Sequence, residues 1–299
     1  MSLYHCLIIV SSYSQRRSIW GQNKIRLFLQ EDRLKHLLED WESIQVRIQK
    51  ARNLLLFLDY DGTLTPIVSR PGLAICPPEL KRLLETLRDL PGITLAVISG
   101  RSLEDLQERI GVSDIVYVGN HGLEMAYPDG KRKNRVSSTR TKELGKITQN
   151  LRTSLKDIPG ILLEEKGPIL SVHYRNVHSR FSGRIPELLT AELQRWKDHW
   201  RIASGKMVLE IRPNVYFHKG EAVREILTTF PSQGCLPIYL GDDQTDEDAF
   251  RVLKGKGISV FVGSESLPSE ADFFLRDPDE VHEFLSRCRE ARRPVGWQS

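Results

Sequence analysis

Residues 54–65 of this 299-residue chain read Leu54-Leu55-Leu56-Phe57-Leu58-Asp59-Tyr60-Asp61-Gly62-Thr63-Leu64-Thr65, which is an apolar run followed by two acids. The first five residues are all apolar, which is typical of a central parallel strand that is covered on both faces. Two carboxylates follow, two residues apart, so both can face one cavity while Tyr60 points elsewhere. Ligands of open α/β sheets bind beyond the carboxyl ends of the strands, where these acids lie.

Three later apolar runs repeat the pattern, at residues 93–98, 115–118 and 237–240. Each ends in a polar cluster, and these clusters contain Ser99, His121 and the pair Asp242-Asp243. Helical spacing at 78–90, 102–110 and 220–229 separates strands along the chain. Any one run could be a strand followed by an ordinary polar turn, but four strand ends meeting at one edge favour a site. The sequence therefore predicts an α/β fold with a doubly wound parallel sheet.

The pattern changes between residues 124 and 212. A turn at Tyr127-Pro128-Asp129-Gly130 precedes a basic stretch, helical segments at 141–155 and 186–200, and strands at 161–165, 170–174 and 207–211. This mixture predicts an inserted α+β cap domain. We expect a discontinuous core domain at 51–123 and 213–299, the cap at 124–212, and a partly helical N-terminal extension at 1–50, with an amphipathic helix over 30–51.

Composition narrows the class of protein. Lys and Arg number 43 and Asp and Glu 39, so the net charge of +4 is too small to indicate a nucleic-acid partner. The apolar segment 7–10 is too short to span a membrane, and it resembles no secretory signal. Four dispersed cysteines form neither a zinc motif nor a disulfide framework. We expect a soluble cytoplasmic protein, and the sequence leaves its oligomeric state open.

The acids at the strand ends also predict a metal site. Carboxylates as close as Asp59 and Asp61 repel each other unless a cation lies between them, and hard oxygen ligands suit Mg²⁺. Asp242 and Asp243 are available to complete an octahedral shell. Calcium is the alternative, but the spacing of an EF-hand is absent.

Asp59-Tyr60-Asp61-Gly62-Thr63-Leu64 resembles the D-x-D-G-T-[LV] signature of the haloacid dehalogenase superfamily of phosphotransferases. Ser99, Lys219 and Gly241-Asp242-Asp243 match its other motifs in order and spacing. The resemblance implies that Asp59 is the nucleophile and Asp61 the general acid and base, which favours a phosphatase over a dehalogenase.

By the same resemblance, Ser99 hydrogen-bonds the phosphoryl group, and Lys219 neutralises that group and orients the nucleophile. Asp242 ligates Mg²⁺ with Asp59 and the backbone carbonyl of Asp61, and Asp243 supports that shell. Attack by a carboxylate splits one difficult displacement into two easier ones.

Residues 119–124, 164–168, 173–175, 205–213 and 241–250 resemble trehalose-6-phosphate phosphatases, in that family's order. The likeness covers about residues 52 to 288 and implies hydrolysis of trehalose 6-phosphate in trehalose biosynthesis. It also implies that charged cap residues bind the sugar, with two further residues near the domain junction. The cap residues are Glu164, Lys166, Arg175, Lys206 and Glu210, and the junction residues are Arg101 and His121.

Other readings stay open from the sequence. Glu164, Lys166 and Lys206 flank strands, where ordinary solvated charges are common. A phosphatase for sucrose 6-phosphate or a glycosylglycerol phosphate would carry the same core motifs. A catalytically silent sugar-phosphate sensor is a third alternative, and the intact acids and Lys219 argue against it.

Overall fold

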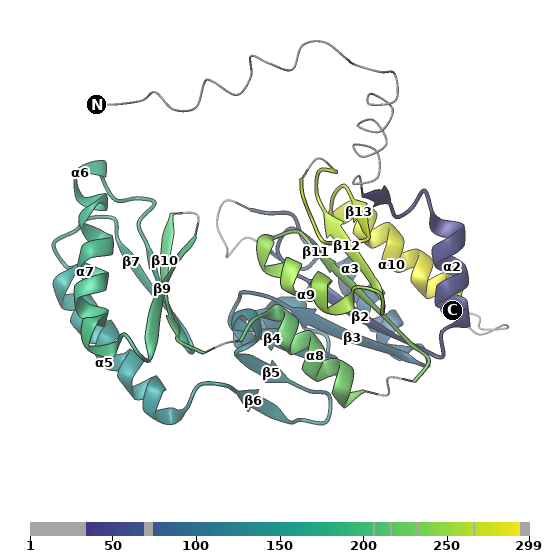
Figure 1. Ribbon diagram of the computed structural model, residues 1–299, viewed down its shortest axis with the longest axis horizontal. Coiled ribbons are helices and arrows are strands. Elements are labelled where there is room, and N and C mark those ends of the chain that lie inside the picture. The colour runs from purple at the N-terminus through teal and green to yellow at the C-terminus, as the bar shows by residue number, and fades with distance from the viewer. Residues whose placement is uncertain are drawn as a thin grey trace, which may run out of the picture.

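A computed structural model describes residues 34–68, 74–205, 207–215, 217–230, 233–265 and 267–293. The described chain forms two units side by side, each built around its own β-sheet (Figure 1). Most of the chain belongs to the larger unit, and residues from about 138 to 213 form the smaller one.

The larger unit contains a nine-stranded sheet in the order β1-β13-β12-β11-β2-β3-β4-β5-β6. Its strands are β1 (Lys35–His36), β2 (Asn53–Asp59), β3 (Ile93–Ile98), β4 (Val116–Gly119), β5 (Glu124–Ala126), β6 (Arg132–Asn134), β11 (Cys235–Gly241), β12 (Ile258–Val262) and β13 (Phe273–Leu275). Neighbours from β1 to β4 are parallel, and β5 and β6 add an antiparallel hairpin. The predicted doubly wound parallel sheet is confirmed.

Helices cover both faces of this sheet. One layer contains α2 (Trp41–Lys50), α3 (Pro78–Asp89), α4 (Leu103–Ile110) and α10 (Pro278–Arg292), and the other contains α8 (Lys219–Thr229) and α9 (Glu247–Leu253). Because side chains of a strand alternate, Leu54, Leu56 and Leu58 pack into the first layer, whereas Leu55 and Phe57 pack into the second. This explains why β2 is apolar at every position.

The smaller unit has an antiparallel sheet in the order β7-β8-β10-β9. Its elements are α5 (Ser138–Ser154), β7 (Leu162–Lys166), β8 (Ile169–His173), α6 (Ser179–Ser182), α7 (Arg184–Leu193), η3 (Gln194–Trp196), β9 (Trp200–Gly205) and β10 (Val208–Pro213). Apolar residues of α5 and α7 pack on one face of this sheet and form a separate core. We call this unit the cap.

The observed boundaries differ from the predicted ones in two places. Residues 124–134, expected in the cap, form the β5–β6 hairpin of the large sheet. Residues 34–50, expected in an N-terminal extension, add β1 to the sheet edge and place α2 against α10, where Trp41 meets Phe284 edge-on. The predicted helix over 30–51 therefore begins only at Trp41, and residues 30–33 lie outside the described residues.

A further difference concerns the predicted helix at 186–200. In the structure α7 ends at Leu193, and Trp200 begins β9, where its side chain is buried against the cap core. β9 pairs with β10 along its full length. The weak alternation of the strand hid it in the sequence, since only its first residue is fully buried.

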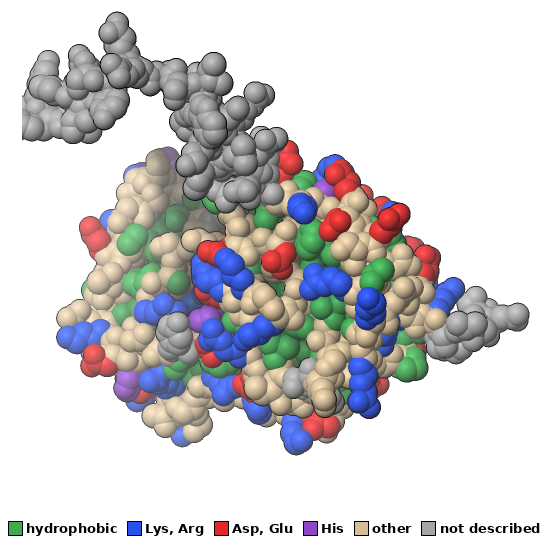
Figure 2. Space-filling model, turned by 45° about the vertical axis from the view of Figure 1, so that its right-hand side comes forward, with side chains coloured by type: hydrophobic (Ala, Val, Ile, Leu, Met, Phe, Trp, Pro, Cys, Tyr) green, Lys and Arg blue, Asp and Glu red, His purple; other side chains and the backbone are tan. Residues whose placement is uncertain are grey.

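The surface carries mixed charge. Figure 2 shows Lys and Arg side chains interspersed with Asp and Glu on the face that it presents. Within the described ranges, no helix is long and apolar enough to cross a bilayer. The segments around Cys6 and residues 7–10 lie outside these ranges.

Candidate active site

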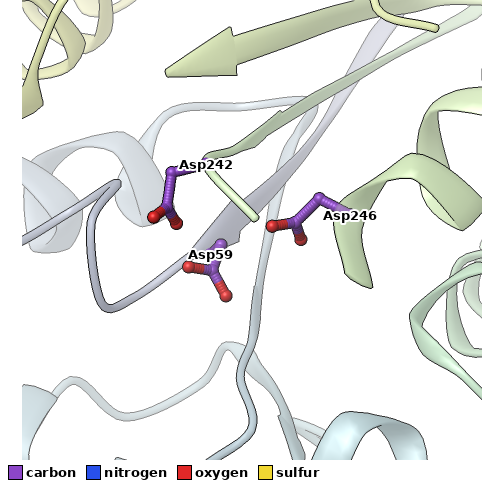
Figure 3. A group of neighbouring side chains, drawn as sticks. All are labelled: Asp59, Asp242 and Asp246. Carbon is purple, nitrogen blue, oxygen red and sulfur yellow. The ribbon is translucent and has the colours of Figure 1, made fainter. Parts of the chain in front are cut away.

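Three carboxylates and one lysine meet at the carboxyl ends of β2 and β11. Asp59 ends β2, Asp242 follows β11, and Asp246 ends the short helix η4 (Gln244–Asp246). Each offers one oxygen atom, and these atoms lie within 4.8 Å of one another. Figure 3 shows the three carboxylates converging from two strand ends and the start of the following helix. Lys219, the first residue of α8, donates to Asp59 Oδ1 at 2.6 Å and to Asp246 Oδ1 at 2.7 Å.

Burial determines the electrostatics of this group. It raises the pKa of Asp59 well above its ordinary value; Lys219 opposes the shift, and the two neighbouring carboxylates add to it. Burial also raises the pKa of Asp242 to about 6, with Asp246 adding to the shift. Burial favours neutral Lys219, but Asp246 and Asp59 outweigh it and raise its pKa, so the amine stays charged. Concentrated negative charge on hard oxygen atoms is what a divalent cation stabilises, so this site can hold one.

Gly62 makes room for this cluster. Its φ is +93°, and a Cβ atom there would lie 2.1 Å from Asp242 Oδ2. A side chain would therefore collide with the acid. The N–H of Gly62 itself donates to the Thr65 carbonyl at 2.7 Å. The close approach of Asp242 is the reason for glycine here.

Asp61 lies apart from the three carboxylates and binds Arg101. The guanidinium donates to both carboxylate oxygens of Asp61, through Nε and Nη2, each at 2.6 Å. Arg101 also donates to Asp105 at 2.8 Å. Ser99 at the end of β3 is 2 % exposed, and its Oγ accepts from the Arg101 backbone N–H at 3.2 Å. The two predicted catalytic residues Asp61 and Ser99 are thus joined through one arginine.

Asp243 is not part of this group of carboxylates. Its exposed carboxylate accepts from the Gln244 N–H at 2.7 Å and so caps η4. Its own N–H donates to Asp246 Oδ2 at 3.0 Å. The structure therefore gives Asp243 a role in shaping the turn that carries Asp246, whereas its predicted place beside the metal remains a prediction.

A cavity of about 400 Å³ lies between the larger unit and the cap. Residues from both units line it, and among them are five of the predicted residues around the sugar and the junction. These five are Arg101, His121, Glu164, Lys166 and Glu210. Asp61 lies on the wall that faces the cap. Arg175 is exposed and is not part of the lining, and Lys206 lies outside the described residues.

Arg212 connects the cap wall to the core. Its Nε donates to Glu210 Oε2 at 2.8 Å, and its Nη2 lies 2.9 Å from His121 Nε2. Burial, with Arg212 and Lys219 close by, lowers the pKa of His121 well below its ordinary value. The imidazole is therefore neutral, and Nε2 accepts from the guanidinium. Glu210 Oε1 in turn accepts from the Ser171 hydroxyl at 3.1 Å, so the carboxylate is held in one orientation.

Asn120 makes a second connection between the units. It is fully buried, and its Nδ2 donates to Glu124 Oε2 at 2.6 Å and to the Lys166 carbonyl at 2.9 Å. The first contact stays within the larger unit, and the second crosses to β7. This bond fixes the main chain of Lys166, whose Nζ lies 3.4 Å from Glu164 in the cavity wall.

Sequence reasoning missed Asp246, Arg212 and Asn120. All three fall inside segments that carried the family resemblance, but their residue types alone assigned them no role. Asp246 is three residues beyond an obvious acidic pair, and only the short helix η4 turns its carboxylate back toward Lys219.

Comparisons with known proteins agree with this geometry. A family model described as trehalose-phosphatase matches residues 57–279. A rice protein (Oryza sativa subsp. japonica) named probable trehalose-phosphate phosphatase 2 is 35% identical over 276 residues, covering 84% of this chain and 71% of that protein. Trehalose-phosphate phosphatase B of Arabidopsis thaliana is 33% identical over 263 residues, covering 83% and 69%. The solved C-terminal domain of C. albicans trehalose-6-phosphate phosphatase superimposes with a TM-score of 0.70 at 26% identity, covering 86% of this chain and 98% of that one. The chain belongs to the trehalose-phosphatase family, within the haloacid dehalogenase superfamily.

Proposed function

We propose that this protein is a magnesium-dependent phosphatase that hydrolyses trehalose 6-phosphate to trehalose and phosphate, a step of trehalose biosynthesis. The observation that carries the proposal is the cavity between the units. One wall presents Asp61, two residues after Asp59, and Arg101 of the core, and the other presents Glu164, Lys166 and Glu210 of the cap. The residues proposed for phosphate transfer and those proposed for sugar binding thus line opposite walls of one cavity.

Asp59 is the nucleophile in this proposal. Lys219 holds its Oδ1, which leaves Oδ2 to attack phosphorus and form an aspartyl-phosphate, with the sugar oxygen leaving. Ser99 and Lys219 donate to the phosphoryl oxygens, where charge develops during transfer. A bound Mg²⁺ supplies further positive charge to those oxygens and to the clustered carboxylates.

The hydrogen bonds favour Asp59 and Asp242 as the side chains that hold Mg²⁺. Both oxygens of Asp246 are already engaged, Oδ1 by Lys219 and Tyr239 and Oδ2 by the Asp243 N–H. Asp246 therefore acts mainly by keeping Lys219 charged and in place. The backbone carbonyl of Asp61 and the carboxylate of Asp243 remain predicted contributors.

Asp61 protonates the departing sugar oxygen and then activates the water that hydrolyses the aspartyl-phosphate. Its ion pair with Arg101 has a consequence for this role. A phosphate group that enters the cavity offers the guanidinium an alternative bidentate partner, which frees the Asp61 carboxylate for proton transfer. Binding of the substrate phosphate to Arg101 thereby releases the Asp61 carboxylate from its ion pair.

The cap selects the sugar. The Glu210 carboxylate is oriented by Ser171 and Arg212 and can accept hydrogen bonds from sugar hydroxyls, while Lys166 donates to them. Asn120 keeps the Lys166 backbone fixed to the core. We further propose a cytoplasmic location, which the free thiols of Cys76, Cys235 and Cys288 support.

A Glu210→Gln variant tests the assignment of substrate. It keeps the shape of the side chain but removes the charge, and hydrogen bonds to charged groups are worth about 1.5–3 kcal/mol. We expect kcat/KM for trehalose 6-phosphate to fall roughly 10- to 150-fold. Turnover of p-nitrophenyl phosphate, which has no sugar, should change little.

Two controls complete the experiment. Glu187→Gln, on the exposed side of cap helix α7, should leave both activities unchanged. The wild-type chain should prefer trehalose 6-phosphate over sucrose 6-phosphate. Equal turnover of the two sugar phosphates would refute the trehalose assignment, and equal losses on both substrates in Glu210→Gln would refute sugar binding by the cap.

A further inference from the structure

A second cavity, of about 510 Å³, lies between α3 and α10. It shares no lining residue with the cavity at the active site. Three arginines are among its lining residues, Arg82, Arg289 and Arg293. The helices belong to the layer on the opposite side of the sheet from α8 and α9. Its basic lining is therefore a feature that the proposed phosphatase mechanism does not use.

The positive charge in this cavity is only weakly compensated. Glu79 is the one carboxylate in the lining, and it approaches Arg82 at 3.4 Å where both side chains are largely exposed. Such exposed pairs contribute little. Arg289 reaches Glu290 only at 3.8 Å, and its buried Nε has no hydrogen-bond partner among the described residues. The Arg289 side chain is 27% exposed, so the outer part of its guanidinium is open to the cavity without a close carboxylate among the described residues.

The remaining lining indicates the kind of ligand. A guanidinium group can form two parallel hydrogen bonds with phosphate oxygens, so a cluster of arginines favours a phosphate ligand. Ser286 adds a hydroxyl group, whereas that of Thr86 donates to the Arg82 carbonyl at 2.8 Å, and Leu80 and Leu83 are apolar lining residues. The volume is in the range of small-molecule sites. It exceeds what a phosphate group alone would fill, so there is room for an attached carbon skeleton.

We propose that the cavity between α3 and α10 is a second anion site, which binds a phosphate group either as inorganic phosphate or on a small phosphorylated metabolite. Its position also connects it to catalysis. His282 of α10 lines the cavity, and its Nε2 donates to the Leu64 carbonyl at 3.0 Å. The Leu64 N–H donates to the Tyr60 carbonyl, within the loop between Asp59 and Thr65. A ligand that moves His282 therefore acts on the loop that carries the nucleophile and Asp61.

Binding can be measured without turnover. Isothermal titration of the full chain carrying Asp59→Asn, in EDTA, would use inorganic phosphate and glucose 6-phosphate as separate probes. When Arg82→Gln and Arg289→Gln are added to the Asp59→Asn chain, the affinity of one of the binding events should fall by about tenfold or more. Adding instead Arg224→Gln, an exposed arginine on α8, should leave that event unchanged. Tighter binding of glucose 6-phosphate than of phosphate would identify a metabolite site, and the reverse order would identify a phosphate site.

Equal affinity and stoichiometry in all three proteins would overturn the proposed site. Circular dichroism and thermal unfolding of each variant exclude a general loss of fold as the reason for weaker binding. This measurement involves no sugar phosphate of the disaccharide class, so a wrong choice of substrate under the proposed function would not change its outcome.

The connection to the loop is tested by inhibition kinetics with p-nitrophenyl phosphate in the chain with native Asp59. Inorganic phosphate competes at the active site and raises the apparent KM in every protein. Occupancy of the second site should also lower kcat, and this effect should disappear in Arg82→Gln/Arg289→Gln but persist in Arg224→Gln. A kcat effect that is identical in both variants would show that His282 transmits nothing.

Discussion

Replacing Lys219 by Met tests whether the buried charges at the site act as one unit. Lys219 Nζ lies 2.6 Å from Asp59 and 2.7 Å from Asp246, and the three side chains are 3%, 6% and 0% exposed. Methionine has a similar length and no charge, so the change removes the cation but fills most of the space. Two buried carboxylates then lose their common partner.

The expected loss of stability is large. Removing one partner of a buried ion pair costs about 3–5 kcal/mol, because the remaining charge stays in a poorly solvated place. Lys219 serves two carboxylates, so we expect a loss in the upper part of that range for the metal-free protein near neutral pH. Lys254→Met is the matched control. Lys254 pairs with Glu270 at 2.8 Å on the surface, and its removal should leave the unfolding free energy essentially unchanged.

The pH dependence separates a charge effect from a packing effect. Lys219 is the main group that lowers the pKa of Asp59, so its removal raises that pKa further in the folded state. A carboxyl group with a raised folded-state pKa binds an additional proton on folding as the pH falls. The stability deficit of Lys219→Met should therefore shrink from about pH 7.5 to about pH 5.5.

The assay is urea denaturation in EDTA at both values, followed by tryptophan fluorescence and circular dichroism. A similar m-value in wild type and variant would show that the same surface unfolds. Two results would refute the reasoning: equal losses in Lys219→Met and Lys254→Met, or a deficit that does not change with pH. In addition, kcat should fall by at least about 10²–10³, as when one electrostatic partner of a transition state is removed.

Two other substitutions make sharp predictions. His121→Asn should reduce the loss of folding stability at low pH. Burial, Arg212 and Lys219 hold the pKa of His121 in the folded chain below 6.5. At lower pH only the unfolded chain therefore gains a proton on this residue, which favours unfolding of the wild type. Between about pH 7.5 and about pH 5.5, wild type should lose up to about 1.4 kcal/mol more unfolding free energy than the variant, and equal losses in urea denaturation would contradict this. Gly62→Ala should weaken Mg²⁺ binding about 10- to 100-fold, because the new Cβ displaces Asp242, and calorimetry measures this. Gly130→Ala is the control, because Gly130 also has a positive φ but an added Cβ would meet nothing within 4 Å. Its Mg²⁺ affinity should stay unchanged. Equal Mg²⁺ affinities in the two variants would refute the steric argument.

The large sheet could be predicted from the sequence because each of its central strands is a continuous apolar run that is visible over a few residues. An apolar run such as β2 is buried on both faces only when it lies between two helical layers. The acids that follow it must then lie at the carboxyl ends of the strands. The same reasoning brought Asp59, Ser99 and Asp242 to neighbouring strand ends, as the pairing of β3, β2 and β11 shows.

The weaker predictions involve contacts between distant segments. Residues 124–134 give little sign of this hairpin, because β5, which pairs with β4, has only three residues, and β6 is exposed along its length. Asp246 and Arg212 were missed for a related reason. Each acts by contacting a residue far away in the sequence, Lys219 in one case and His121 in the other, and one sequence does not reveal such pairs.

The same structure suggests why chemistry and substrate choice can vary independently in this fold. The proposed nucleophile, Lys219 and the candidate metal ligands all belong to the larger unit, whose core is separate from that of the cap. The cap contributes the charges that we propose face the sugar, and side-chain hydrogen bonds of Asn120 and Arg212 link it to the core. Under the proposed function, a change in a cap side chain such as Glu210 should alter which ester is held without moving Asp59. A change in either link alters how the two walls are placed, and it should affect sugar phosphates more than a small ester that contacts only the core.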